Sequence, residues 1–397
     1  MSSQPTFLDA PSAAESLGVS RATLYAYVSR GMIRTHEAPD DPRRRLYSAQ
    51  DIDLLRTRKA TGRRPSDAAA ASLDWGLPVL SSGITLIEGG RLFYRGQDVT
   101  CLAQTATIED IARLLWDCGE QDPFANAKSL PPSWDRSIFE ALGALPLTER
   151  CQSLLPLVPA GRTTAWQRDT RHLWTGAAAL LRAVAAAASH TQPSDEDIHV
   201  HLARAWSQDA AGADLVRRAL VLVADHELNA SAFAVRVVAS TGASLGACLN
   251  AGLSGLSGPL HGGTTSLVEM LFDEVETTND AASVIDSRLR RGEGVPGFGH
   301  PLYPEGDARA SALLPLLPHH NSRDSLVEVM EETTGKRPTI DFALVAIRRA
   351  LRLPRGSALA LFAAGRTVGW IAHALEQRRN EKLIRPRARY TGPPAQP

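Results

Sequence analysis

From residue 108 onward, apolar residues recur at the spacing of a helix in one segment after another. A helix places residues three and four apart on one face, so this spacing predicts amphipathic helices that pack on one another. The expected helices are residues 108–116, 134–142, 176–188, 215–225, 231–240, 245–256, 265–275, 281–289, 308–316, 326–333, 340–353 and 359–377. Neither a nucleotide-binding fingerprint nor a parallel-strand pattern accompanies them. This part of the chain is therefore predicted to be a large all-α body.

The start of the chain has the pattern of a helix-turn-helix. Residues 12–17 predict a short helix and Gly18 predicts a turn. Ser20 is a good helix cap, and the helix that it opens is expected to run to about Arg30. Leu24 is expected to face the core of this small domain. The residues expected to face outward are Arg21, Thr23 and Tyr25.

A basic region surrounds this pattern. Residues 20–64 contain eleven arginines and lysines against five acidic residues, although the whole chain balances 43 basic against 43 acidic residues. A polar excursion at residues 40–47 precedes a further helix expected at residues 48–59. The arginines in this excursion are Arg43, Arg44 and Arg45. Such a local positive excess is typical of a surface that binds nucleic-acid phosphates. The alternative is a solvated charged face that contacts another protein.

Between the basic region and the helical body, the chain changes character. Residues 61–74 are polar and then rich in alanine, which predicts a linker. Residues 84–95 predict a β-hairpin that turns at Gly89 and Gly90. This hairpin is the only β-structure expected in the body.

The cysteines and the apolar segments predict a cytoplasmic protein. Four cysteines are scattered without metal-ligand or redox spacing, which suits reduced thiols. These are Cys101, Cys118, Cys151 and Cys248. The first residues lack the pattern of a signal peptide, and no uncharged apolar stretch approaches about 20 residues, so no membrane span is expected.

Candidate chemistry gathers in the second half of the chain. His300 lies in the loop 294–303, which contains three glycines, and His261 lies in a Gly-Pro-Leu-His-Gly-Gly turn. Asp341 opens an expected helix, where a carboxylate is favoured. Two imidazoles and one carboxylate are sufficient to remove a carbon-bound proton and to protonate a carbonyl. Guanidinium groups suit a di- or tricarboxylic substrate, because each contacts a carboxylate at two points. The candidates are Arg309, Arg366 and Arg385.

Each of these histidines also has a structural alternative, because an isolated histidine in a helical protein is more often part of the packing. His226 lies between two acidic residues and would equally suit a structural hydrogen-bond hub. His199 and His201 have a spacing found in metal sites, but no third ligand is evident, so no metal is predicted.

Seven ordered motifs from about Trp75 onward resemble the citrate synthase family. They are Arg91–Asp98, Asp225–Ser231, Gly258–Gly263, Gly297–His300 with Asp307–Arg309, Ile340–Phe342, Gly365–His373 and Arg385–Gly392. The N-terminal helices and the basic excursion resemble the winged helix of MerR-type proteins, with the excursion as the wing.

These resemblances imply a mainly α protein, with large and small helical domains of the citrate synthase type behind a small winged helix. The implied domains are 1–60 for the winged helix, 61–74 for the linker, 75–261 with 354–397 for the large domain, and 262–353 for a small mobile domain. The small domain would close over the substrates and exclude water.

The citrate synthase resemblance also implies roles for the candidate residues. Asp341 would remove a methyl proton from acetyl-CoA while His261 donates a hydrogen bond to the thioester oxygen. His300 would polarise or protonate the ketone of oxaloacetate, and water would then cleave citryl-CoA to citrate. The residues implied to hold oxaloacetate are His226, Arg309, Arg366 and Arg385. Coenzyme A thioester is the co-substrate, no permanently bound cofactor is implied, and the loop implied to bind it is Val295, Pro296, Gly297, Phe298 and Gly299.

A homodimer is implied as well, with Arg385 crossing to the partner subunit. Two departures from the family pattern concern coenzyme A, since Pro301 and Pro304 stand where bacterial relatives usually have basic residues. Two alternatives therefore stay open. One is 2-methylcitrate synthesis from propionyl-CoA. The other is a DNA-binding regulator that senses a metabolite through the citrate synthase body.

Overall fold

The computed structural model divides the chain into two units, Met1–Ser81 and Ser82–Pro397. The structure describes residues 7–30, 32–38, 41–61, 80–125, 130–159, 167, 169–388 and 390–393, without the side chains of residues 42, 43 and 57–61. The expected linker lies almost entirely outside the described residues.

The first unit is a helix-turn-helix with a three-stranded antiparallel sheet of order β1-β3-β2. Its elements are β1 (Phe7–Leu8), α1 (Ala10–Leu17), α2 (Arg21–Ser29), β2 (Thr35–Ala38), β3 (Asp41–Ser48) and α3 (Ala49–Thr61). Gly18 adopts a left-handed conformation (φ 59°) at the end of α1. Ser20 caps α2, since its hydroxyl accepts a hydrogen bond from the Thr23 amide at 3.2 Å. Leu24 is fully buried in a core that contains Ile33 and Ile52. The expected helices are confirmed, and the excursion between them is the β2–β3 hairpin.

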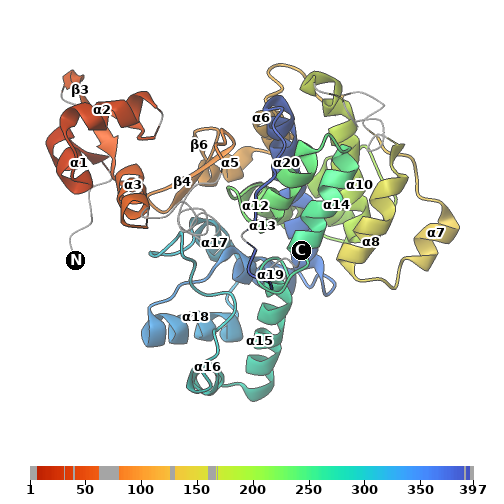
Figure 1. Ribbon diagram of the computed structural model, residues 1–397. Helices are drawn as coiled ribbons and strands as arrows, with labels where there is room; N and C mark the ends of the chain where they lie inside the picture. Colours follow the sequence, from red (N-terminus) through yellow and green to blue (C-terminus); the bar gives the residue numbers. More distant parts are fainter. Residues whose placement is uncertain are drawn as a thin grey trace. The chain divides into compact units, whose positions relative to one another are not determined.

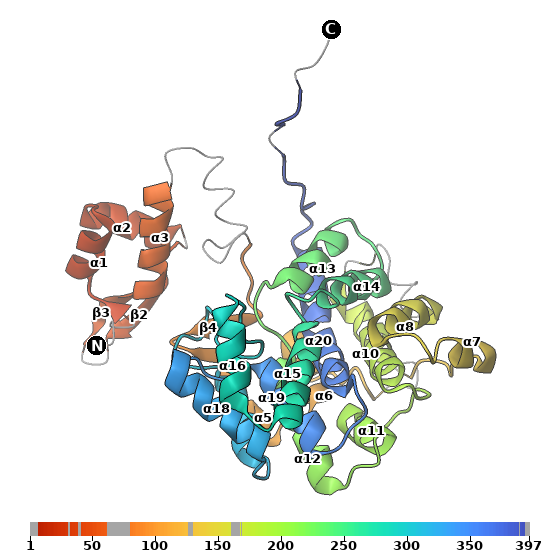
Figure 2. The same cartoon turned by 90° about the horizontal axis from the view of Figure 1, so that it is seen from below.

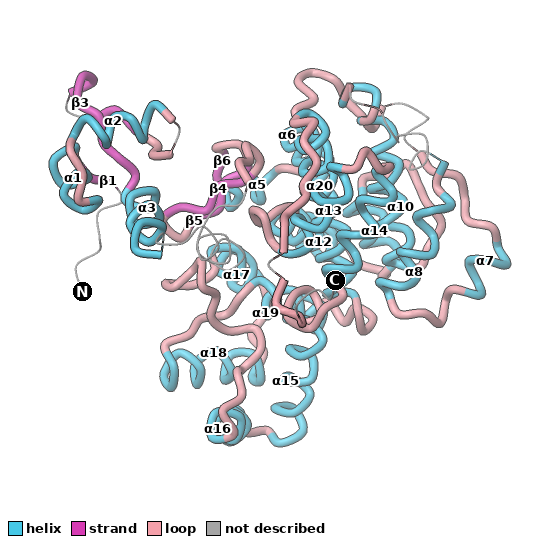
Figure 3. Tube along the Cα trace, viewed as in Figure 1, coloured by secondary structure: helices cyan, strands magenta, loops and turns pink. Residues whose placement is uncertain are grey.

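The second unit begins with a small sheet of order β4-β5-β6 (Figure 3). Its strands are β4 (Thr85–Glu88), β5 (Arg91–Tyr94) and β6 (Gln97–Asp98). The β4–β5 turn requires positive φ at both central residues, Gly89 (58°) and Gly90 (73°), which glycine adopts without strain. The expected hairpin is confirmed.

Helices make up the rest of the second unit (Figure 1). They are α5 (Val99–Thr105), α6 (Ile108–Trp116), α7 (Arg136–Ala141), α8 (Leu147–Leu154), α10 (Trp174–Ser189), α11 (Ile198–Ala205), α12 (Ala210–Val223), α13 (Ala230–Ser240), α14 (Leu245–Leu256), α15 (Thr264–Thr278), α16 (Ala281–Arg290), α17 (Ala308–Leu313), α18 (Asn321–Thr334), α19 (Ile340–Ala350) and α20 (Ser357–Arg379), with short 3-10 turns at η2 (Leu155–Leu157), η3 (Thr170–His172) and η4 (Leu314–Leu316). The sequence did not predict α5, α8 and α11. Each has at most eight residues, too few for a helical apolar period to stand out.

The longest helix, α20, forms the centre of the unit, where it packs against α6, α10, α12, α13, α14 and α19 (Figure 1). It is apolar on all sides, as expected for a helix surrounded by others. In the described part of the chain it is the one helix with the length and composition to span a membrane, and 94% of its apolar window is buried inside the protein. It is therefore a core helix of this unit.

Two glycines of α20 bring the end of α12 unusually close. A Cβ atom on Gly365 would lie 2.5 Å from Cγ2 of Val223, and one on Gly369 would collide with Asp225 and the Ala224 carbonyl. The Gly369 amide instead donates a hydrogen bond to that carbonyl at 3.0 Å. The residues that follow α12, Ala224 and Asp225, therefore lie directly against α20.

Helices α15 to α19 lie on one side of α20, where α19 packs against it (Figure 1). In this group α15 packs on α16, α18 and α19, and α17 packs on α19. Arg349 of α19 joins it to α15 through ion pairs with Glu269, Asp273 and Glu276, at 2.8–3.0 Å. The ends of α15, α17 and α19 carry several of the candidate residues.

Candidate active site

The candidate residues come from the ends of helices and from the loops beside them. His226 follows α12, His261 precedes α15, and His300 lies in the loop before α17. Asp341 is the second residue of α19, as the sequence predicted. His226 and His300 contact each other through their rings. The pKa of His226 is affected by the charges of Arg309 of α17, Arg366 of α20, His300 and His261, and that of Asp341 by the charges of Arg309 and Arg366. These side chains therefore lie in one region. The structure thus brings six of the seven candidate catalytic and substrate-binding residues together.

His226 and His300 contact each other directly. Their rings meet edge to face, with centroids 5.2 Å apart. The Nε2 atom of His226 lies 2.9 Å from the Tyr303 hydroxyl. In His300 the Nδ1 atom accepts the Leu302 amide hydrogen at 3.2 Å, so a neutral ring carries its proton on Nε2. Burial, followed by the charge of Arg309, lowers the pKa of His300 to about 4. His300 is therefore a neutral hydrogen-bond donor near pH 7.

The loop that carries His300 is tied to the start of α19. Gly297 (φ 85°) and Gly299 (φ 75°) both adopt left-handed conformations, which explains two of its glycines. The Thr339 amide donates to the Gly297 carbonyl at 2.8 Å, and the Gly299 amide donates to the Arg337 carbonyl at 2.9 Å. These bonds fix the histidine loop beside the segment that leads into Asp341.

His261 is held from the other side. Its Nε2 atom lies 2.8 Å from the Ser231 hydroxyl oxygen, which also accepts a hydrogen bond from the indole of Trp370 at 3.1 Å. The His261 ring meets Phe362 edge to face, with centroids 6.0 Å apart. Burial, with a smaller effect of the charge of Arg366, lowers the pKa of His261 to about 4. The Ser231 hydroxyl donates its proton to Asn229 Oδ1 at 2.7 Å, so the neutral His261 ring donates to Ser231 from Nε2. Nδ1 is the ring atom that faces no partner among these residues.

Asp341 has the environment of a base rather than that of an ion-pair partner. Among the described residues, its Oδ1 atom is buried and accepts no hydrogen bond. Burial disfavours the charged carboxylate and raises the pKa of Asp341 to about 6, even though the charge of Arg309 acts in the opposite direction. The position at a helix start therefore does not keep its pKa low. A carboxylate with few partners and a raised pKa is well suited to accept a proton near neutral pH.

The two buried arginines differ in their partners. Arg309 makes a two-pronged ion pair with Asp307, at 2.9 and 2.8 Å, and lies over the Tyr303 ring. Arg366 donates from Nε to the Val223 carbonyl at 2.8 Å and lies over Phe362. Among the described residues, no carboxylate lies within ion-pair distance of Arg366. Its guanidinium is therefore the better placed of the two to accept a new carboxylate partner.

The structure does not bring Arg385 to this cluster. It is exposed, on the segment that follows α20 and runs outward from the helices (Figure 2). The Val295 and Phe298 side chains of the loop predicted to bind coenzyme A are buried, and Phe298 packs on Phe342 with ring centroids 4.9 Å apart. Gly299 is exposed. The buried Val295 and Phe298 side chains therefore hold the loop in place by packing inside the protein.

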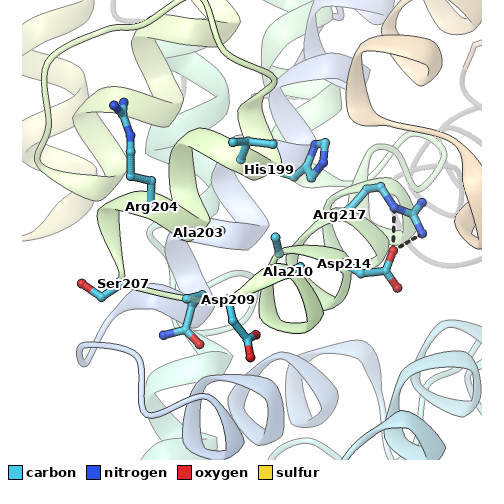
Figure 4. A pocket seen from close by; sticks show the side chains of 11 residues that line it. His199, Ala203, Arg204, Ser207, Asp209, Ala210, Asp214 and Arg217 are labelled. Carbon is cyan, nitrogen blue, oxygen red and sulfur yellow. Dashed lines mark hydrogen bonds and ion pairs between the residues drawn. The ribbon is translucent and has the colours of Figure 1, made fainter.

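A separate hollow of about 670 Å³ lies between α11 and α12 (Figure 4). His199, Arg204 and Arg217 are among its lining residues, and none of the candidate catalytic residues is. His201 is turned away, with its ring nitrogens 2.7 Å from the hydroxyls of Thr191 and Ser194. The described residues include no cluster of three or more histidine, cysteine or carboxylate side chains that would hold a metal.

The first unit has a groove of about 690 Å³, lined in part by Tyr25, Arg44 and Arg45 but not by Arg21 or Thr23. Tyr25 is half-exposed, and Arg44 lies 3.7 Å from Asp9. Arg45 contacts the Thr35 hydroxyl at 3.3 Å. Arg21 is exposed, and the Thr23 hydroxyl is engaged by Ser20 at 3.0 Å. The side chain of Arg43 lies outside the described residues.

Sequence reasoning missed several residues that position the site. Ser231 ends the Asp225–Ser231 motif and Tyr303 ends the loop 294–303, but the sequence indicates no role for either. Asp307 was noted only as a neighbour of Arg309. Tyr94 of β5 lies far away in sequence, yet its hydroxyl donates to the Val221 carbonyl at 3.1 Å and so fixes the end of α12. No sequence signal predicts that contact, because it depends on how β5 packs on α12.

A helical body that gathers neutral imidazoles, an isolated carboxylate and buried guanidinium groups defines a class of proteins built for acid–base chemistry on a carboxylic substrate. Residues 72–387 match the family model described as "Citrate synthase, C-terminal domain". The chain belongs to the citrate synthase family. Residues 11–61 match the model described as "MerR HTH family regulatory protein".

Individual relatives agree with this assignment. The citrate synthase of Haloferax volcanii is 30% identical over 359 residues, which span 80% of this chain and 94% of that protein. The 2-methylcitrate synthase 1 of Corynebacterium glutamicum is 29% identical over 344 residues, which span 77% of this chain and 90% of that protein. The crystal structure of citrate synthase from Thermotoga maritima superposes with a TM-score of 0.65 at 26% identity, covering 80% of this chain and 94% of that one.

Proposed function

We propose that the protein condenses acetyl-CoA with oxaloacetate and hydrolyses the resulting citryl-CoA to citrate and coenzyme A. The observation that supports this most directly is the environment of Asp341. Its buried Oδ1 lacks a hydrogen-bond partner among the described residues, and the pKa of the carboxyl is raised to about 6. Two imidazoles with lowered pKa values lie in the same region.

In the proposed reaction Asp341 removes a proton from the thioester methyl group, and His261 donates a hydrogen bond to the thioester oxygen. A thioester methyl is a very weak acid, so the developing charge on oxygen needs this donor; one such donor is typically worth about 10²–10³ in rate. For this step the neutral His261 ring carries its proton on Nδ1, so the Ser231 hydroxyl turns from Asn229 to donate to Nε2. His300 donates from Nε2 to the ketone of oxaloacetate as the new carbon–carbon bond forms. Arg309, Arg366 and His226 hold the substrate carboxylates, and water then cleaves the thioester.

The domain boundaries and the dimer belong to the same proposal. Residues 75–261 with 354–397 form the large domain, and residues 262–353 form a small domain that closes over both substrates. The grouping of α15 to α19 supports this division. Val295 to Gly299 contact coenzyme A, which is a co-substrate and not a bound cofactor. In a homodimer, the exposed Arg385 reaches the site of the partner subunit.

The test is turnover by the wild-type protein. We expect thiol release from acetyl-CoA that depends on oxaloacetate. Propionyl-CoA, run in parallel, tests the second candidate, 2-methylcitrate synthesis, which the similarity to the Corynebacterium glutamicum enzyme favours. One methylene shifts discrimination by only about 1–3 kcal/mol, so the ratio of the two kcat/KM values decides between them. Absence of turnover with every acyl-CoA would remove the enzymatic proposal.

We also propose that the first unit binds duplex DNA. The match to the MerR-type model, the local excess of basic residues and the groove beside Tyr25 support it. Binding is expected to weaken steeply with salt, because phosphate contacts release counterions. Replacing Arg44 and Arg45 together by alanine should reduce the slope of log K against log salt by about 2.

The control for this prediction is a double alanine variant at Arg136 and Arg171, two exposed arginines of the second unit. It changes the net charge equally and is expected to leave the slope unchanged. The measurement is a titration of labelled duplex DNA by fluorescence anisotropy at several salt concentrations, with and without oxaloacetate. No affinity at low salt, or equal slopes for both variants, contradicts the proposal.

A further inference from the structure

Arg366 is a buried cation with an unusual set of partners. Only 1% of its surface is exposed, and it contacts the Val223 carbonyl and the ring of Phe362. Among the described residues, none places a carboxylate within ion-pair distance of it. A buried charge without compensation is strongly unfavourable. Some other charge must therefore balance Arg366 before a substrate carboxylate binds.

Asp225 lies beside α20, next to Arg366. It touches Gly369, which is three residues after Arg366 on α20, and it follows by two residues the Val223 carbonyl that Arg366 binds. Its charge acts on Arg366 accordingly. Asp225 is fully buried, and its Oδ2 atom accepts the Thr85 hydroxyl hydrogen at 2.6 Å. Its Oδ1 atom lies 3.3 Å from Nε2 of His373, without hydrogen-bond geometry. Burial raises the pKa of Asp225, but His373, Arg366 and Thr85 together lower it below its usual range. Asp225 is therefore ionised.

The groups around Asp225 do not neutralise its negative charge, so that this charge can balance Arg366. Nδ1 of His373 lies 3.4 Å from a nitrogen of Arg236, which can only donate, so Nδ1 accepts and the ring proton lies on Nε2, on the side of Asp225. Arg236 is balanced separately, because it forms an ion pair with Glu376 at 2.6 Å. Two buried cations thus have two distinct carboxylates.

We propose that Asp225 is the resident counter-ion of Arg366, near enough to balance its charge before substrate binds but too far to occupy its N–H donors. Those donors stay available for a substrate carboxylate. Asp225 does not touch the substrate and acts through Arg366, so it is a positioning residue. The inference rests on the proposed function, in which Arg366 binds oxaloacetate.

The test compares thermal unfolding of Asp225→Asn and Glu376→Gln, which each remove the carboxylate partner of one buried arginine while keeping the shape of the side chain. Breaking a buried charge pair is expected to lower Tm by about 5–10 °C in both variants. Malate, a dicarboxylate that cannot condense, replaces the missing counter-charge only at Arg366. The rise in Tm caused by malate should therefore exceed the wild-type rise in Asp225→Asn and equal it in Glu376→Gln. An equal or smaller rise in Asp225→Asn overturns the inference.

A double variant keeps the inference testable if Asp225→Asn does not fold. Adding Arg366→Met removes the unbalanced cation, so the double variant should be more stable than Asp225→Asn alone. A double variant that is no more stable contradicts the assigned pair. This comparison needs no ligand and is independent of the proposed function, which fails separately if wild-type protein shows neither turnover nor stabilisation by oxaloacetate or malate.

Discussion

Replacing Asp341 by asparagine should reduce turnover by about 10²–10⁴-fold, the range that a positioned general base contributes. The amide has nearly the same shape but cannot take a proton from the thioester methyl group. Dicarboxylate binding should be largely preserved, because the arginines that hold the substrate are unchanged. The measurements are kcat from thiol release and the dissociation constant of malate by calorimetry.

The pH dependence of turnover by the wild-type enzyme tests the role of Asp341 as the base independently. The base works as the ionised carboxylate, and the pKa of Asp341 is raised to about 6 by burial. Turnover should therefore fall as pH decreases through about 6, and the Asp341→Asn variant should lose this limb from its residual activity. His261 and His300 have pKa values near 4, so they stay neutral across that range. A variant that keeps wild-type turnover and the same acidic limb would exclude Asp341 as the base.

The motifs around the histidines allowed most of this cluster to be predicted from sequence. Glycines at positions 297 and 299 indicated a tight loop, and the structure gives both a positive φ. The helices were equally predictable where apolar periods were long, as in α20. Short helices such as α11 escaped detection because one or two turns give too little periodic signal.

The electrostatic state of each group depended on packing that the sequence does not reveal. The sequence placed Asp341 at a helix start, which favours an ionised carboxylate. In the structure burial outweighs that preference, because Oδ1 is enclosed without a hydrogen-bond donor among the described residues. Likewise, the sequence alone predicts the same carboxylate-binding role for Arg309 and Arg366. Only the fold shows that Asp307 already holds Arg309, whereas Arg366 has no such partner among the described residues.

That difference predicts distinct outcomes for the two arginines. Arg366→Met should raise KM for oxaloacetate by about 10²–10³-fold, since it removes a two-pronged, charge-assisted contact to a carboxylate. KM for acetyl-CoA should stay close to the wild-type value. Arg309→Met should also impair oxaloacetate binding, but it breaks the buried pair with Asp307 and should cost about 3–5 kcal/mol of folding free energy. Steady-state kinetics and denaturant unfolding of both variants provide the comparison.

Arg366→Lys is the matched control, because it keeps the positive charge and removes the planar fork of donors. Its KM for oxaloacetate should lie between those of wild type and Arg366→Met, which separates the geometric part of binding from the Coulombic part. Equal KM values for the lysine and methionine variants would mean that charge alone contributes little. A parallel rise in both KM values, for oxaloacetate and acetyl-CoA, would instead indicate general distortion of the site around α20 and would contradict a specific role for this guanidinium in holding the dicarboxylate.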